Sequence, residues 1–300
     1  MSIESRSPLA QSLFQHVDML SGVIGPRHPL KARTMAATSA YIESQFRAAE
    51  LPVTRETFLV NGQPTDNVVV TIPGHKTPND VVILGAHYDS TPTTPGADDN
   101  GSAVAVLIET ACMLKSARPG RTIRFVAFAC EEAPYYGTSE MGSLVHAQGC
   151  RSRRENVIGM LCLEMVGYYV DDKNSQDVPP AIPKSLRWLL PRRGNFLAAV
   201  GNPRSTGLCW KFRRGFKRGT QFPLFSIVLP ESIREIHLSD QHAFWINDYP
   251  ALMLTDTSFL RNPNYHRWTD TADTLDYERM ADVTRGVASA VRHLAGARWT

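Results

Sequence analysis

The sequence predicts an α/β fold, a three-layer sandwich in which a mixed, mostly parallel central sheet lies between two layers of helices. Short apolar runs with the composition of buried strands alternate with longer segments whose apolar residues recur at helical spacing. This alternation is typical of sheets that carry helices on both faces. Of the 300 residues, 43% are hydrophobic, which is enough to bury a sizeable core. Because no repeat or linker interrupts the pattern, we expect a single domain over residues 1–300.

The first half of the chain is predicted to alternate between helix and strand. A helix is expected over 34–49, because Met35, Ile42 and Phe46 fall on one face. The almost entirely apolar composition of 101–115 predicts a well-buried helix. Strands are expected from four short β-prone runs, at 52–60, 67–73, 80–86 and 121–129. Turn residues at 73–80 separate the second run from the third.

The second half continues this alternation with one interruption. Segment 171–194 is rich in Asp, Pro and Lys, which predicts a surface insertion. Asp276 is positioned to cap a final helix whose inner face carries Met280, Val287 and Leu294. The remaining elements are two helices, around 139–148 and 205–217, and three strands, at 157–163, 195–200 and 250–255.

Charge and cysteine content limit the class of protein. The net charge of +3 is too small to indicate a nucleic-acid partner, and no run of about 20 apolar residues predicts a membrane partner. The five cysteines are odd in number and include no CxxC pair, as expected of reduced core thiols. The first residues lack the basic and apolar pattern of a signal peptide. We therefore expect a cytoplasmic protein, although a trimmed leader would leave no trace. The oligomeric state is open.

One basic run, 211–218, stands out, with Trp210, Phe212 and Phe216 interleaved among its cations. The simplest interpretation is a solvated helix or loop face whose aromatic side chains pack inward. Two alternatives are a border of a substrate cleft and, less favoured, a nucleic-acid patch.

Polar residues follow the predicted strands at their carboxyl ends, where α/β folds place their chemistry. His87 follows one buried run, and Asp89, two residues later on the same face, can accept a proton from the second imidazole nitrogen. Next comes Gly96-Ala-Asp-Asp-Asn-Gly, whose adjacent carboxylates repel each other and gain from a cation. One of these two Asp residues can bridge two metal ions, and a polar turn that caps a helix is the alternative.

Glu131 and Glu132 directly follow the very apolar strand at 121–129, where burying a carboxylate without a partner is costly. One of them can bind a metal while the other serves as general base. An exposed acidic loop is the alternative. Glu164 repeats the pattern after strand 157–163, and His266 lies in a polar loop after strand 250–255. Two histidines and several carboxylates after successive strands predict a two-metal hydrolase site, for which zinc is the usual ion.

Five separated motifs resemble, in the same order, those of the zinc-dependent exopeptidases of metallopeptidase family twenty-eight. This family includes leucyl-type aminopeptidases, glutamate carboxypeptidase and, more distantly, glutaminyl cyclase. The resemblance extends from about residue 34 to 295, and its motifs are His87-Tyr-Asp-Ser, Gly96-Ala-Asp-Asp-Asn-Gly, Glu131-Glu132, Leu163-Glu-Met and Tyr265-His266. It implies a zinc-peptidase fold of the phosphorylase/hydrolase-like type. It also implies an aminopeptidase that removes N-terminal residues from peptides with a free amino terminus.

The resemblance further implies two Zn²⁺ ions per chain and a ligand set. His87 and Glu164 are expected to bind one ion, and Glu132 and His266 the other. Asp99, the second Asp of the Gly-Ala-Asp-Asp pattern, is expected to bridge both ions. Many family members carry Asp in place of Glu164, so this chain keeps the carboxylate and adds a methylene of reach.

The same resemblance implies the groups that act on the substrate. Glu131 is expected to be the general base, and Asp89 is expected to orient His87. Tyr265 corresponds to a tyrosine that in some members hydrogen-bonds the developing oxyanion. The stretch 239–245 resembles a Ser-Asp…Phe-Trp motif, in which Asp240 and His242 are candidates for either the cleft wall or a structural role.

Three other functions stay open for this fold. Glutaminyl-peptide cyclotransferases share it and several ligands, but work with a single zinc. A metallo-carboxypeptidase needs cations for a terminal carboxylate, which segment 211–218 can supply. A non-catalytic binding module is least favoured, because all expected ligands and the base are present.

Overall fold

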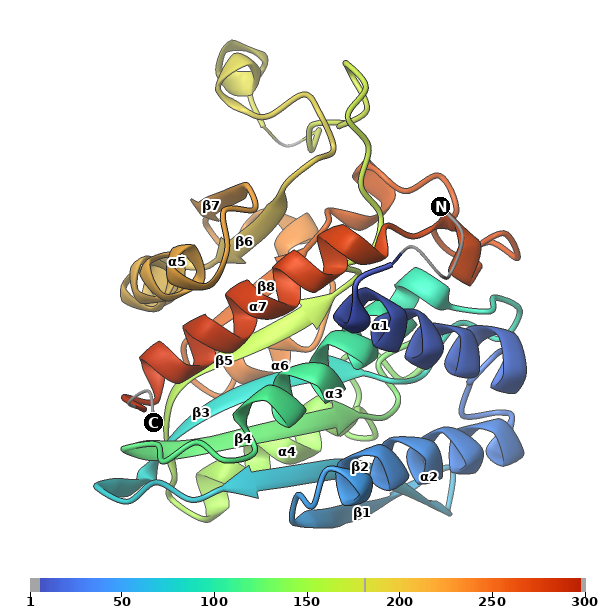
Figure 1. Cartoon of the computed structure of the whole chain (residues 1–300), viewed down its shortest axis with the longest axis vertical. Helices are drawn as coiled ribbons and strands as arrows, with labels where there is room; N and C mark the ends of the chain where they lie inside the picture. Colours follow the sequence, from blue (N-terminus) through green and yellow to red (C-terminus); the bar gives the residue numbers. More distant parts are fainter. Residues whose placement is uncertain (1–5, 181, 298–300) are drawn as a thin grey trace.

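The computed structural model describes residues 6–180 and 182–297, and these residues build one mixed sheet covered by helices (Figure 1). The described part of the chain forms eight hydrogen-bonded strands in the order β1-β2-β4-β3-β5-β8-β6-β7. The strands are β1 (Val53–Val60), β2 (Gln63–Ile72), β3 (Thr77–His87), β4 (Arg121–Phe128), β5 (Asn156–Glu164), β6 (Leu197–Gly201), β7 (Leu224–Val228) and β8 (Ala251–Thr255). The central strands β4, β3, β5 and β8 are mutually parallel.

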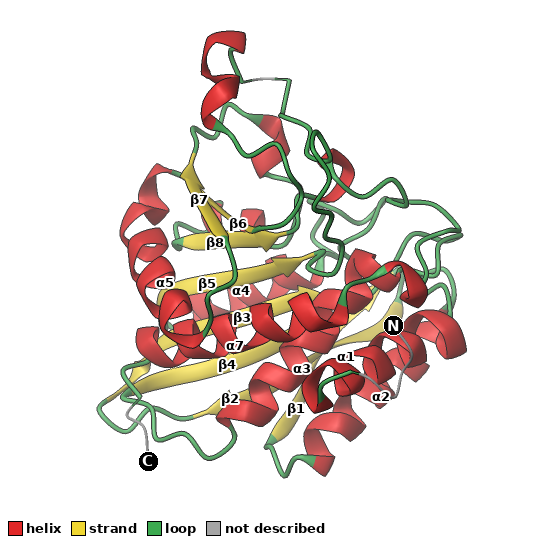
Figure 2. Ribbon diagram, turned by 45° about the horizontal axis from the view of Figure 1, so that its top comes forward, coloured by secondary structure: helices red, strands yellow, loops and turns green. Residues whose placement is uncertain are grey.

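Helices cover both faces of the sheet, as Figure 2 shows. They are α1 (Pro8–Asp18), α2 (Ala32–Ala48), α3 (Ala103–Leu114), α4 (Gly142–Ser152), α5 (Thr206–Gly219), α6 (Gln241–Trp245) and α7 (Tyr277–Leu294). Side-chain alternation on β3 explains the two layers. Val82 and Leu84 join the core beneath α1, α2, α3, α5 and α7, whereas Val81 and Ile83 join the core beneath α4 and α6. None of the described helices is both long and apolar enough to cross a membrane.

The predicted α/β sandwich is confirmed, with differences at element boundaries and in the second half. β3 begins at Thr77, inside the predicted turn, and α4 begins at Gly142 rather than near 139. Among the described α-helices and strands, α1, β7 and the short α6 were not predicted. The Asp276 carboxylate accepts the backbone N–H of Arg279 and so caps α7, as expected. All five cysteines are free.

Segment 171–194 contains no strand or α-helix among its described residues. It carries a short 3-10 helix, Lys184–Leu189, at the end of the molecule that lies at the top of Figure 1. The segment leads into β6, which runs antiparallel to β8. The direction of the sheet therefore reverses at β6, and β7 follows β6 in parallel.

Strand register aligns the carboxyl ends of the central strands. His87, the last residue of β3, pairs with Phe128, the last residue of β4. Glu164, the last residue of β5, pairs with Thr255, the last residue of β8. Residues at and just beyond these ends therefore meet along a single edge of the sheet.

Close packing of α5 on α7 depends on glycine. A Cβ added to Gly286 would lie 2.4 Å from the Phe216 ring, which is fully buried. We expect Gly286→Ala to lower the free energy of unfolding by about 1–3 kcal/mol through overpacking, as measured by urea denaturation. Helix propensity alone would make the alanine variant more stable, since alanine is a better helix former than glycine by about 1 kcal/mol.

Gly207 in α5 is the matched control for this substitution, because an added Cβ there meets no atom within 4 Å. Gly207→Ala is expected to leave stability unchanged or slightly higher. If the two alanine variants unfold at the same urea concentration, tight packing at Gly286 is refuted.

Candidate metal centre

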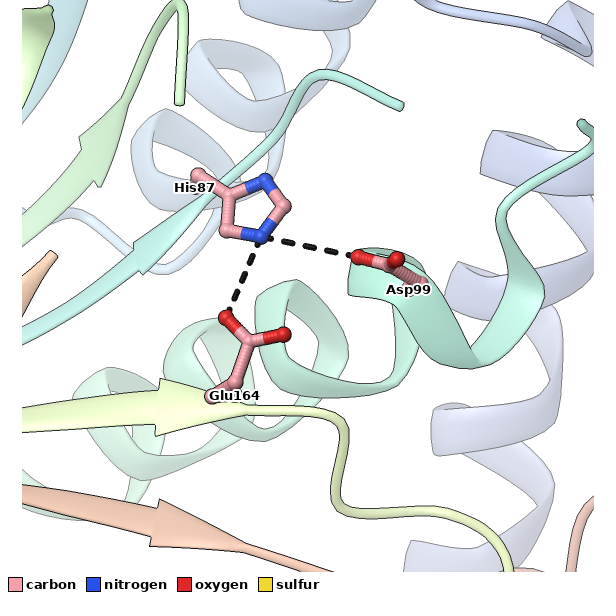
Figure 3. A group of neighbouring side chains, drawn as sticks. All are labelled: His87, Asp99 and Glu164. Carbon is pink, nitrogen blue, oxygen red and sulfur yellow. Dashed lines mark ion pairs between the residues drawn. The ribbon is translucent and has the colours of Figure 1, made fainter. Parts of the chain in front are cut away.

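The candidate site lies at the edge where the parallel strands end. His87 and Glu164 are the terminal residues of β3 and β5, and Glu131 and Glu132 follow β4. Asp99 comes from the irregular turn Ala97–Ser102 that precedes α3. Figure 3 shows the His87 imidazole facing the carboxylates of Asp99 and Glu164. His266 reaches the same place from the loop after β8. The structure thus brings all five predicted metal ligands together.

The ligands form two trios that share Asp99. In the first, His87 Nε2 lies 3.3 Å from Glu164 Oε2 and 3.6 Å from Asp99 Oδ1. In the second, His266 Nε2 lies 3.1 Å from Asp99 Oδ2 and 3.7 Å from Glu132 Oε2. Asp99 therefore presents one carboxylate oxygen to each trio.

These separations fit ligands around an ion. With zinc–ligand bonds of about 2.0–2.1 Å, neighbouring corners of a tetrahedron are about 3.4 Å apart. The buried His87 Nε2 and Glu132 Oε1 have no hydrogen-bond partner among the described residues. A buried polar atom without a partner is costly, so both atoms fit the role of metal ligands.

The electrostatics of the site also favour a cation. Burial, reinforced by Glu164 and Glu132 and opposed by His87, raises the pKa of Glu131 well above its usual range. Burial and the nearby Asp99 raise the pKa of Glu132 to about 9. A divalent cation among these carboxylates offsets their mutual repulsion and so stabilises their charged forms.

Asp89 connects His87 with the loop that carries Glu131 and Glu132. Its carboxylate accepts the backbone N–H groups of Glu131 at 3.1 Å and Glu132 at 2.9 Å. One of its oxygens also lies 3.5 Å from His87 Nδ1, and that nitrogen is 3.2 Å from the Asp89 backbone oxygen. The side chain therefore holds the loop after β4 in addition to facing His87.

The structure separates the roles of the two adjacent aspartates. The Asp98 carboxylate points away from both trios, where it accepts the Gly167 N–H at 2.9 Å and the Asn262 amide at 2.7 Å. Asp270 fixes the turn by accepting the backbone N–H groups of Asp98 at 2.9 Å and Asp99 at 3.1 Å. Asp270 was not anticipated, because its polar loop offers no signal that distinguishes it from its neighbours.

Arg27 is a second supporting residue that sequence reasoning missed. Its fully buried guanidinium donates to the backbone oxygens of Tyr88, Pro95 and Gly96, and so holds the loop between His87 and Asp99. Burial lowers its pKa to about 10, with Asp270 the main opposing influence. The side chain stays charged at neutral pH.

Other predicted residues lie around the ligands or in the 239–245 stretch. The Tyr265 ring stacks on His266 with 3.8 Å between ring centroids. Burial and Asp99 raise the pKa of the Tyr265 phenol, which therefore keeps its proton as a donor. From the 239–245 stretch, Ser239 Oγ donates to Glu164 Oε2 at 2.5 Å. Asp240 is fully buried, whereas His242 is half-buried.

A large apolar cavity of about 960 Å³, including its open mouth, adjoins Glu164 and Tyr265. Its wall is mostly aliphatic and aromatic. One part comes from β6, β7 and β8, namely Ala198, Val200, Phe225, Ile227 and Met253, and the rest comes from the connecting loops, including Phe196 just before β6. The described lining includes no Lys, Arg or His. Its charged members are Glu164, Asp177 and Glu235.

The basic run forms α5, on the opposite side of β6 from this cavity. Phe212 and Phe216 pack into the core with Leu197 and Ala199, as the helix-face interpretation predicts. Trp210 differs, since its side chain is exposed. Because the cavity-lining residues of β6 alternate with those beneath α5, the run does not border the cavity.

Comparison with known proteins gives three kinds of likeness. The family described as Peptidase family M28 matches residues 67–206. The uncharacterized protein YfbL of Escherichia coli is 36% identical over 286 residues, which span 92% of this chain and 86% of that protein. The zinc aminopeptidase BSAP from Bacillus subtilis has a similar structure, with a TM-score of 0.73 and 17% identity over 94% of each chain. The glutaminyl cyclase of Tannerella forsythia gives a TM-score of 0.67 and 18% identity over 94% of this chain and 98% of its own.

Proposed function

The chain belongs to peptidase family M28 and is a metallo-exopeptidase, and on that premise we propose that it is an aminopeptidase that works with two zinc ions. The observation that carries the proposal is the shared Asp99 carboxylate, which offers one oxygen to each of two ligand trios. Carboxylate-bridged pairs of ions are typical of hydrolytic enzymes that activate water.

The residues around the trios supply the remaining steps. When bound, zinc supplies Lewis-acid activation of water and of the scissile carbonyl. Glu131, which belongs to neither trio, takes a proton from the attacking water and returns it to the leaving amine. The Tyr265 phenol donates a hydrogen bond to the carbonyl oxygen as its charge grows. Asp89 keeps Glu131 and Glu132 in place through their backbone N–H groups.

The cavity suggests which substrates fit. The carboxylates of the site attract a free amino terminus, and the apolar wall next to Glu164 and Tyr265 receives the N-terminal side chain. We propose a preference for large apolar N-terminal residues. The described lining provides no cation for a substrate C-terminal carboxylate, which disfavours the carboxypeptidase alternative.

The proposal is tested by metal content and substrate screening together. We expect close to two zinc ions per chain, hydrolysis of leucyl- and phenylalanyl-arylamides that a chelator abolishes, and no cyclisation of a peptide with N-terminal Gln. One zinc ion per chain together with cyclisation would instead support the cyclotransferase alternative, in which one trio has no metal to bind.

Cavity size is tested by substitution on the edge strand β7. Ile227 is half-buried and lines the cavity. Ile227→Trp is expected to lower kcat/KM for phenylalanyl-arylamide at least about tenfold, because the larger indole ring occupies cavity volume that the substrate's phenyl ring needs. Hydrolysis of the small alanyl-arylamide is expected to change far less. Equal losses for both substrates would contradict this assignment of the cavity.

A further inference from the structure

Charge is distributed very unevenly along this chain. Residues 178–230 contain ten Lys and Arg and no Asp or Glu. The rest of the chain holds 22 Lys and Arg against 29 Asp and Glu. The small overall net charge of +3 therefore conceals one strongly basic segment within an otherwise acidic protein.

The basic segment is also contiguous in space. It builds the 3-10 helix Lys184–Leu189, then β6, α5 and β7. In both Figure 1 and Figure 2 the 3-10 helix lies at the tip of the molecule, and β6, β7 and α5 follow below it on the left side. The acidic metal centre lies at the sheet edge, outside this segment.

The outward side of α5 is where the cations gather. We call Lys211, Arg213, Arg214, Lys217 and Arg218 the basic face, and all five side chains are exposed. The inward side of α5 is already occupied, because Phe212 and Phe216 are buried in the core. The outward side of α5, which carries the basic face and Trp210, is therefore accessible to another molecule.

Internal ion pairs do not neutralise the basic face. Among the described residues, no carboxylate lies within ion-pair distance of any of its five cations. Arg214 packs over the Trp210 ring at 5.6 Å from its centroid, and Arg218 lies 3.1 Å from His293 Nδ1. Burial and the nearby Arg218, Arg214 and Lys211 lower the pKa of His293, as expected beside uncompensated positive charge.

Large apolar side chains accompany these cations at the surface. Trp210 on α5 is 61% exposed, and at the tip Trp188 and Leu189 are 77% and 56% exposed. Tryptophan is favoured where apolar and aqueous media meet, and basic residues beside it attract anionic headgroups. An exposed leucine gains nothing from a nucleic acid, whereas it gains from contact with acyl chains.

We propose that the basic face and the tip together form a docking surface for an anionic lipid bilayer. The cations are attracted to the negative headgroups, and Trp188, Leu189 and Trp210 enter the interfacial layer. Binding of this kind is peripheral, reversible and weakened by salt, because the electrostatic attraction is screened within a Debye length. The inference does not depend on the proposed peptidase activity.

The test is co-sedimentation of the full chain with phosphatidylcholine vesicles that contain or lack phosphatidylglycerol. We expect binding only to the anionic vesicles and release at high salt. The triple variant Arg213→Glu/Arg214→Glu/Lys217→Glu is expected to lower the partition coefficient about 100-fold or more, since each cation near the surface contributes roughly a factor of five. Trp188→Ser/Leu189→Ser is expected to weaken binding while leaving its salt dependence intact.

A matched control reverses three charges elsewhere. Arg33, Lys115 and Arg118 are exposed and lie outside the basic segment. Arg33→Glu/Lys115→Glu/Arg118→Glu makes the same change in net charge and is expected to retain vesicle binding. Circular dichroism and thermal unfolding verify that each variant is folded.

Three results would overturn the proposal. The first is equal binding to neutral and anionic vesicles, or binding to neither. The second is an equal loss of binding in the two triple variants, which would show that vesicle binding depends on the net charge of the protein and not on the basic face. The third is tighter binding, at the same ionic strength, to a single-stranded oligonucleotide than to anionic vesicles, which would identify the surface as a nucleic-acid site.

Discussion

Replacing Glu131 by glutamine is expected to lower kcat for leucyl-arylamide about 1,000-fold while leaving the zinc content of the protein unchanged. Loss of a positioned general base typically costs 10²–10⁴-fold in rate, and the amide cannot take the proton from water. Glu131 Oε2 lies 3.8 Å from His87 Nε2, yet the residue belongs to neither trio. Steady-state kinetics and metal analysis on the same sample measure both quantities.

Glu140 is a suitable control for Glu131. It is a half-buried carboxylate nine residues further along the same connection between β4 and α4, where it accepts the backbone N–H of Asn61 at 3.0 Å. Glu140→Gln is expected to keep the kcat of the unsubstituted protein. If Glu131→Gln hydrolyses the arylamide at the normal rate, Glu131 is not the base. If it loses zinc in proportion to activity, Glu131 is a ligand instead.

Replacing Asp99 by asparagine is expected to remove most activity and to weaken zinc binding at least about 100-fold. Loss of residues that merely support metal ligands already costs about 10–100-fold in affinity, and Asp99 offers an oxygen to both trios. The substitution is also expected to remove most of the stabilisation by metal, since a Kd about 100-fold higher leaves only about 1.4 kcal/mol at the same zinc concentration. Zinc at about 1,000 times its Kd raises the free energy of unfolding of a binding protein by about 4 kcal/mol.

Thermal unfolding with and without a chelator measures this effect. The unsubstituted protein is expected to melt at a lower temperature in the chelator, and the chelator is expected to shift the melting temperature of Asp99→Asn by a much smaller amount. Asp98→Asn is the matched control, because Asp98 contacts Gly167 and Asn262 rather than the trios. It is expected to lose stability but to keep its zinc when metal is saturating. Equal loss of zinc in both variants would contradict the assignment of Asp99.

Much of the fold was predictable because local patterns and global packing agree. The apolar runs that form β3, β4 and β5 are short, continuous and each followed by polar residues, so both their type and their carboxyl ends are visible in the sequence. Once such strands are parallel and aligned, as His87 with Phe128, the polar residues beyond them must converge. The candidate ligands needed no other information to be placed in one region.

What escaped prediction depends on contacts between distant parts of the chain. Arg27 and Asp270 support the turn that carries Asp99, but neither belongs to a periodic pattern. β7 is a half-buried edge strand without clear alternation, and α6 is too short for helical spacing to be visible. The choice between Asp98 and Asp99 came from resemblance alone, because adjacent aspartates are equivalent until the turn around them is defined.

The reversed direction of β6 has an evolutionary consequence. Because β6 runs antiparallel to β8, its first residues lie at the edge where β5 and β8 end, with Ala198 paired to Thr255. The connection that enters β6 therefore arrives beside the metal centre without contributing any of its candidate ligands. Such a segment can lengthen, shorten or change composition while His87, Asp99 and Glu164 stay where they are. Substrate specificity can therefore change through this connection while the metal ligands stay in place.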